Sequence, residues 1–154
     1  MFSQFYLPLL GFHNVLRWVA LLAGVIALAV AFSGWSGARQ SNRLLLRCSI
    51  LFVIAMDLQF LLGLVLYFGA SPLTQQAFQD IGAAMKVRDL RFFTVEHTVL
   101  AFLAIVLAHL GAALARKSQT VLAQHRRAAI CFALSLLVLL IGIPWWRPLL
   151  RFGS

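Results

Sequence analysis

Acidic residues are scarce in this sequence of 154 residues, which contains four Asp and Glu against 13 Lys and Arg. Charged residues make up only 11% of the chain, whereas 62% is hydrophobic, and the mean hydropathy is +0.93. A soluble core of this length cannot bury so much apolar surface, so we expect lipid to solvate the chain. The net charge of +9 would indicate nucleic acid in a soluble protein. Here the basic residues lie at the ends of apolar segments, so no nucleic-acid partner is expected.

Cysteine and the common catalytic motifs are also nearly absent. Cys48 and Cys131 lie within apolar stretches, so the sequence predicts packing residues rather than a disulfide framework. No Cys-x-x-Cys-His sequence is present for covalent haem attachment, and no hydrolase, nucleotide-binding or Cys/His zinc motif occurs. The polar residues within the apolar segments are therefore the candidates for chemistry.

Four apolar segments are suited to crossing a bilayer, which takes roughly 20 residues of helix. The first contains His13, Asn14 and Arg17, which a cleaved signal sequence would hardly tolerate, so we expect it to be retained as a span. The chain is then one transmembrane domain over 1–154, an all-α antiparallel bundle of membrane-spanning helices. The predicted spans are 7–32, 46–69, 91–115 and 128–143.

Basic residues distinguish the two ends of this bundle. Connections rich in Lys and Arg stay in the cytoplasm, so we expect the first and third connections inside and both termini outside. The remaining connection, 70–90, has Pro72 ahead of apolar residues, which predicts a short surface helix that caps the outer end. The basic residues of the two inner connections are Arg39, Arg43, Arg47, Arg116, Lys117, Arg126 and Arg127.

Polar residues inside the spans indicate a site, because each needs a partner or a purpose in lipid. His13 in the first span and His97 in the third are expected at similar depths near the outer end. Each begins a row of small residues at helical spacing, which lets helices approach closely or leaves room for a flat cofactor. We expect five polar residues to converge in the outer half of the bundle interior: His13, Arg17, Gln59, Glu96 and His97.

Two interpretations fit the two histidines. As axial ligands, His13 and His97 would hold a haem b between facing helices. Alternatively, they hydrogen-bond across helices, for instance His97 to Gln59 or His13 to Glu96, and only fix the packing. The residues alone leave both interpretations open. The arginines available for haem propionates are Arg17, Arg91 and Arg147.

Three further polar residues need an account. Asp57 lies near the middle of the second span, where it either pairs with Arg17 or accepts protons for redox or transport chemistry. His109 lies about 18 Å along the helix from His97, so the two cannot share one iron. We expect His109 to be interfacial or hydrogen-bonded. His125 is predicted to be a solvated loop residue.

Tryptophans are concentrated near the expected outer interface. Trp18, Trp145 and Trp146 are placed as an aromatic belt would be. The segment 143–147, with Pro144 and Arg147, is also suited to wall a cofactor or quinone site.

Short motifs spread over nearly the whole chain carry a resemblance. They are His13-Asn14-x-x-Arg17-Trp18, Asp57-x-Gln59-x-x-x-Gly63-x-x-x-Tyr67, Arg91-Phe92-x-x-Val95-Glu96-His97 and Ile143-Pro144-Trp145. In these motifs the chain resembles a small four-span bacterial membrane family often labelled cytochrome b-like. The resemblance implies a bacterial inner-membrane protein with a role near respiration. Some relatives have a histidine where this chain has Asp57, so a scheme that needs a ligand from the second span does not carry over.

Three functions of different classes remain open from the sequence. The first is a haem b protein that relays electrons, with quinol as a candidate donor. The second is a non-catalytic subunit or assembly factor of a respiratory membrane complex, whose polar residues hold its bundle and its partners, which are other subunits or further copies of the chain. The third is a small transporter organised around Asp57 and Arg17. No enzymatic activity is assigned.

Overall fold

The computed structural model describes residues 5–37 and 42–147, and in these ranges it contains helices and no strand. Four helical spans are long and apolar enough to cross a membrane. The predicted all-α four-helix bundle is thereby confirmed for the described residues. The spans are Tyr6–Trp35, Asn42–Ala70, Arg88–Lys117 and Val121–Gly142.

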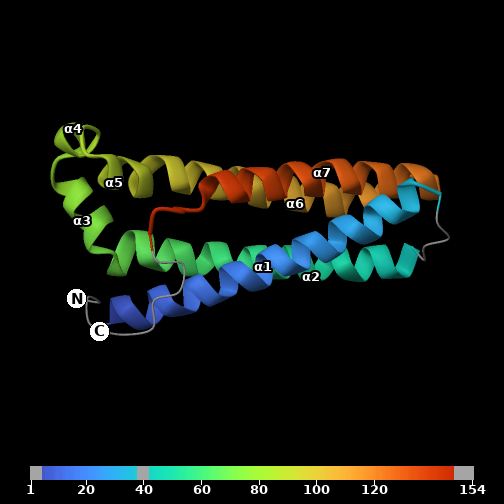
Figure 1. The fold of residues 1–154 in the computed structure, drawn as a ribbon, viewed down its shortest axis with the longest axis horizontal. Coiled ribbons are helices and arrows are strands. Elements are labelled where there is room, and N and C mark those ends of the chain that lie inside the picture. Colours follow the sequence, from blue (N-terminus) through green and yellow to red (C-terminus); the bar gives the residue numbers. More distant parts are fainter. Residues whose placement is uncertain (1–4, 38–41, 148–154) are drawn as a thin grey trace.

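The four long helices form a closed ring. Helix α1 (Tyr6–Trp35) packs against α2 (Asn42–Val65) and α7 (Val121–Gly142), and α6 (His97–Lys117) packs against the same two helices. Successive helices run in opposite directions (Figure 1). Because α1 and α6 are therefore diagonal to each other, side chains that they both point inward meet at the centre of the bundle.

Two of the spans contain π-helical turns at the same end of the bundle. Helix α2 continues into η2 (Leu66–Ala70), and α6 is preceded by α5 (Arg88–Arg91) and η3 (Phe92–Glu96). Between them lie α3 (Pro72–Gln79) and α4 (Ile81–Ala84), which together with α5 cover this end (Figure 1). We call it the capped end.

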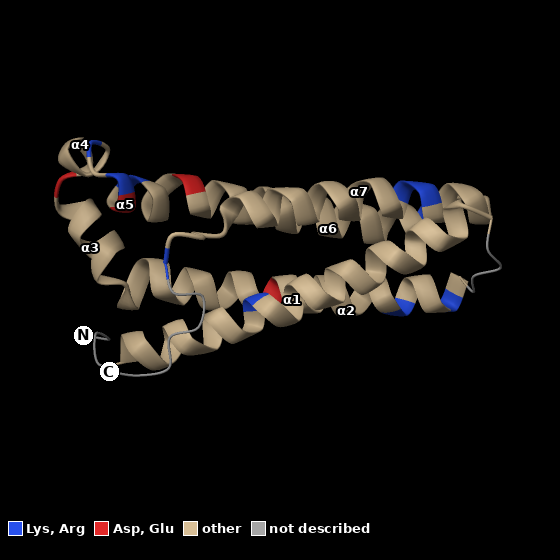
Figure 2. Ribbon diagram, viewed as in Figure 1, with Lys and Arg blue, Asp and Glu red and all other residues tan. Residues whose placement is uncertain are grey.

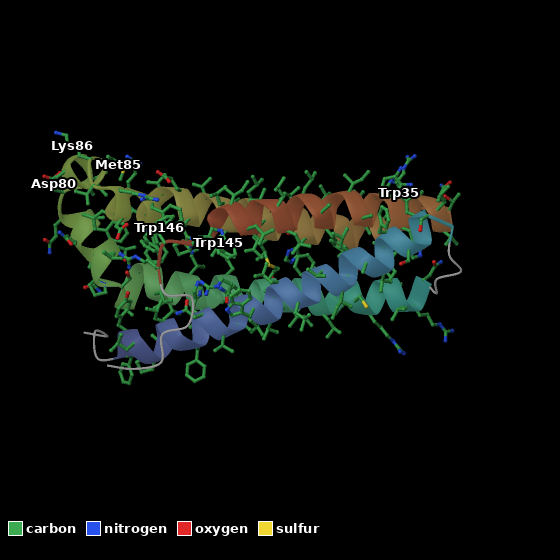
Figure 3. The ribbon with its side chains drawn as sticks, viewed as in Figure 1. Trp35, Asp80, Met85, Lys86, Trp145 and Trp146 are labelled. Atoms are coloured by element: carbon green, nitrogen blue, oxygen red, sulfur yellow. The ribbon has the colours of Figure 1, made fainter. Side chains whose placement is uncertain are left out.

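The connection at the capped end contains the predicted helix with a proline in its first turn. Pro72 begins α3, and the Thr74 hydroxyl donates to the Tyr67 carbonyl at 2.7 Å. Ala77 and Ala84 pack with Leu90 in a small buried cluster. Helix α3 also contacts both π-helical segments, and Figure 3 shows Asp80 and Lys86 on the outer side of the cap.

Small residues and two phenylalanines fill the middle of the bundle. A Cβ on Gly24 would lie 2.7 Å from the Phe52 ring, and one on Gly111 would lie 2.6 Å from the Phe132 ring. The two rings contact each other edge to face, with centroids 5.5 Å apart. The predicted rows of small residues do face the interior. The two phenylalanine rings fill the space beside them, farther from the capped end than the histidines, and leave no room there for a cofactor.

The fourth span begins earlier than its predicted start at residue 128. Helix α7 starts at Val121 because the Thr120 side chain caps it, accepting a hydrogen bond from the Ala123 amide at 3.2 Å. His125 therefore lies inside a helix and is fully buried. The prediction that His125 is a solvated loop residue is wrong.

Basic residues are found at both ends of the bundle (Figure 2). At the end opposite the cap, Arg43, Arg47, Arg126 and Arg127 lie in the first two turns of α2 and α7, and Arg116 and Lys117 lie in the last turn of α6. Arg39 lies outside the described residues. At the capped end, basic and acidic side chains are mixed, as the colours of α5 and its neighbours show (Figure 2).

Candidate functional site

His13 and His97 meet across the centre of the bundle near its capped end. Their ring centroids are 6.3 Å apart, and the ring planes are inclined at 69°. His13 comes from α1 and His97 from the diagonal helix α6. At 1.5 Å per residue, they lie about 10–14 Å along their spans from the capped end. The pair therefore lies within the membrane-spanning helices, nearer to the capped end than to the opposite end.

His97 is held by the end of α7. Its Nδ1 lies 2.8 Å from the carbonyl oxygen of Gly142, the last residue of that helix. The last carbonyls of a helix have no partner within it, so this oxygen is free to accept a hydrogen bond. An oxygen can only accept, so Nδ1 carries the proton, and in the neutral ring Nε2 carries the lone pair. His97 is thus fixed in the tautomer that many metal-bound histidines have.

His13 is less completely satisfied than His97. Its Nε2 lies 3.2 Å from Nε2 of Gln59, and an amide nitrogen is a donor, so this ring atom accepts. Among the residues that the structure describes, His13 Nδ1 and Gln59 Oε1 are both buried without a hydrogen-bond partner. A Cβ on Gly63 would lie 3.3 Å from His13 Cε1, so a glycine at this position gives the ring its space.

The two histidines line a largely apolar pocket that extends toward the cap. Arg17 from α1 is buried at its edge, and Arg147, which follows α7, also lines it. All four spans contribute to its walls. The wall residues discussed below are His13, Arg17, Gln59, Gly63, Tyr67, Phe93, His97, Gly142, Ile143, Pro144 and Arg147.

The segment after α7 is fastened across the pocket. The Arg147 guanidinium pairs with the Asp89 carboxylate of α5 and lies 4.8 Å from the centre of the Phe93 ring. The Trp146 indole donates to the same carboxylate at 3.3 Å. Figure 3 shows Trp146 and Trp145 in the capped half of the bundle, far from Trp35. Of the segment 143–147, Ile143, Pro144 and Arg147 line the pocket, whereas Trp145 and Trp146 do not. Asp89 holds Arg147 in place.

The π-helical segments set the position of His97. The Tyr67 hydroxyl, in η2, donates to the Thr94 carbonyl in η3 at 2.9 Å. Single π-turns in helices are frequent at functional sites. Tyr67 also lies on the same face of its span as Gln59 and Gly63, because the three are spaced by four residues. That spacing is the signal in the sequence that could have added Tyr67 to the site; nothing pointed to the Gly142 carbonyl.

Two residues expected at the site do not reach it. Glu96 pairs with Arg91 at 2.7 Å, with side chains 43% and 45% exposed, and neither lines the pocket. The expected convergence thus holds for His13, Gln59 and His97, together with Arg17, and not for Glu96. His97 bonds to the Gly142 carbonyl instead of to Gln59, and His13 bonds to Gln59 instead of to Glu96.

Asp57 differs from expectation, and His109 is its neighbour. Asp57 Oδ1 lies 3.4 Å from His109 Nε2, so the carboxylate expected beside Arg17 is found next to a histidine outside the pocket. His109 is hydrogen-bonded, as expected, to the Ile105 carbonyl at 3.0 Å. This pair lies apart from the His13–His97 site.

No family model, curated protein or solved structure matches this chain. Within residues 5–37 and 42–147, no group of three or more His, Cys, Asp or Glu side chains is placed to hold a metal ion. The pocket brings together two imidazole rings, those of His13 and His97.

Proposed function

We propose that the protein binds haem b through His13 and His97 and relays electrons in the outer half of the bacterial inner membrane. The observation that carries the proposal is the hydrogen bond from His97 Nδ1 to the Gly142 carbonyl. It leaves the Nε2 lone pair of a partly buried imidazole facing a largely apolar pocket that a second imidazole also lines. A histidine used only for packing needs no such vacant nitrogen.

The donor set fits the cofactor. Two imidazoles that ligate one metal at about 2 Å each have ring centroids roughly 6 Å apart, close to the 6.3 Å that separates His13 and His97. Buried polar atoms without a hydrogen-bond partner, His13 Nδ1 and Gln59 Oε1, also support a bound group at this level. Ligation through His13 Nε2 requires the Gln59 amide to release that atom.

The remaining pocket residues have roles that follow from their charge and position. Bound haem b supplies a one-electron redox centre. Arg17 and Arg147 would compensate its propionates, because uncompensated charge is costly at this depth. Asp89 and Trp146 hold Arg147 in place. Tyr67 supports the segment that precedes His97.

The depth of the site favours a donor from within the membrane. The two histidines lie about 10–14 Å from the capped end of their spans, within lipid rather than in water. We propose quinol as the electron donor because it is dissolved in the same layer. The largely apolar walls of the pocket are compatible with such a neighbour.

The proposed side of the membrane makes a separate prediction. Single cysteines introduced at Gln79 in α3 and at Gln119 before α7 test the orientation, because both positions are exposed. The protein's own cysteines, Cys48 and Cys131, are buried. An impermeant thiol reagent should label Gln79→Cys in intact cells and Gln119→Cys only after permeabilisation, because the basic connections stay in the cytoplasm. The opposite pattern would reverse the orientation. Ser41, in the first basic connection, lies outside the described residues.

Haem content of the purified protein tests the function itself. Protein made in haem-sufficient cells should contain one b-type haem per chain, with absorption bands that change on reduction. A protein that is folded and helical but has no such bands would leave the histidines as packing residues, which is the competing interpretation.

A further inference from the structure

A second polar pair lies on the outer surface of the bundle, well within the length of its two spans. Asp57 of α2 and His109 of α6 face each other, with Oδ1 and Nε2 3.4 Å apart and side chains 42% and 50% exposed. Asp57 is about 20 Å from either end of its span at 1.5 Å per residue. The exposed part of this pair therefore faces the hydrocarbon layer.

The structure leaves the pair incompletely satisfied. His109 Nδ1 donates to the Ile105 carbonyl, so Nε2 is the atom left for Asp57. One proton between Nε2 and the carboxylate makes the pair neutral. The 3.4 Å separation is long for a charge-assisted hydrogen bond. Lipid offers no partner for the remaining carboxylate oxygen, and an unpaired polar group there costs several kcal/mol.

We propose that the α2–α6 face is the interface with a second copy of this chain. A two-fold axis along the membrane normal brings residues of one copy against residues at the same depth in the other copy. The same surface patch of both copies then forms the contact. Since the patch contains one acid and one base at one depth, Asp57 of each copy then meets His109 of the other. The four groups form one network, and no net charge is added.

The surroundings of the pair suit this occupant. Ile54 and Leu61 on α2 and Val106 and Leu110 on α6 are all exposed, and they would pack as an apolar rim around the central polar network. The chemistry of the patch is self-complementary, as a two-fold contact requires. This interface does not depend on the proposed haem site, which lies in the bundle interior.

Exchanging the charges tests the contact. An Asp57→His variant has two bases at the patch, and a His109→Asp variant has two acids. Alone, each should self-associate in liposomes at least about tenfold more weakly than the unaltered chain, because like groups meet. Mixed together, the two variants should form mixed dimers with at least about tenfold preference, because each acid then meets a base.

The readout is single-molecule photobleaching of labelled copies at low protein-to-lipid ratio. Unaltered protein should bleach in two steps, and so should Asp80→His, which makes the same chemical change on the cap. If the unaltered chain bleaches in one step, the proposal is overturned. The patch then faces lipid or a different membrane protein. The proposal is also overturned if Asp57→His and His109→Asp each dimerise alone as strongly as they do with each other, because the interface then lies elsewhere.

Cross-linking gives a measurement that keeps both polar residues in place. When a Leu61→Cys copy is mixed with a Val106→Cys copy, the two should form a disulfide under a membrane-permeable oxidant, because α2 of each copy faces α6 of the other and both residues lie one turn from the pair toward the capped end. The control is Val25→Cys on α1, which is also lipid-facing but lies on a helix outside the proposed interface, and should not cross-link. Equal cross-linking of this control and of the mixed pair would contradict the assignment of the face.

Discussion

Replacing His97 with alanine should lower haem content by at least roughly tenfold, because loss of a group that only supports a metal ligand already costs about that much. The substitution removes the imidazole that the Gly142 carbonyl orients and leaves the opposite ring of His13 without a facing ligand. His13→Ala should have the same effect. Haem content per chain, measured on protein purified in parallel with the unaltered chain, gives the result.

The matched control for this prediction is His109→Ala. It removes a histidine from the same helix, but one that pairs with Asp57 outside the pocket, so haem content should stay at the unaltered level. Added imidazole should restore the absorption bands of His97→Ala, because a small ligand can occupy the space left by the ring. Full haem content in both His13→Ala and His97→Ala would show that neither is a ligand.

Replacing Gly34 with alanine should destabilise the bundle strongly. The new Cβ would lie 2.1 Å from His125 Nδ1 and 2.4 Å from its Cγ, so the whole ring has to move. His125 is fully buried and cannot turn outward without disturbing the packing of α1 on α7. Overpacking of this kind costs about 1–3 kcal/mol, which thermal unfolding in detergent should show as a lower midpoint.

A double substitution separates this contact from a general effect of alanine. Gly34→Ala combined with His125→Ala should lose much less stability than the sum of the two single changes, because the clash is absent once the ring is gone. Gly82→Ala is the control glycine, since its nearest neighbour, Asp80 Oδ1, would be at 3.4 Å. Strict additivity of the Gly34 and His125 changes would contradict the close approach seen here.

The architecture could be predicted from the sequence because lipid imposes simple rules. Lengths near 20 apolar residues and polar breaks between them place the spans, and the rows of small residues from Ala20 to Ala27 and from Ala104 to Gly111 mark the inward faces. The convergence of His13 and His97 follows from depth and face alone.

Other features could not be predicted because they depend on neighbours or on local helix geometry. Glu96 directly precedes His97, and adjacent residues on a helix point in different directions, so it could not share the inward face. The π-turn η3 further changes the register ahead of His97. His125 was misplaced because a cap at Thr120 extends α7 into residues whose charges suggest a loop. The pairing of Asp57 with His109 depends on the way that α2 and α6 pack.

Identification of the axial ligands tests the central claim most directly. Near-infrared magnetic circular dichroism and electron paramagnetic resonance of the oxidised, haem-loaded protein report which side chains bind the iron. We predict a low-spin ferric haem with two nitrogen ligands of the imidazole type, and loss of that signature in His13→Ala and in His97→Ala. A haem with one imidazole, or with a bis-imidazole signature that survives either substitution, would contradict the assignment of this pair.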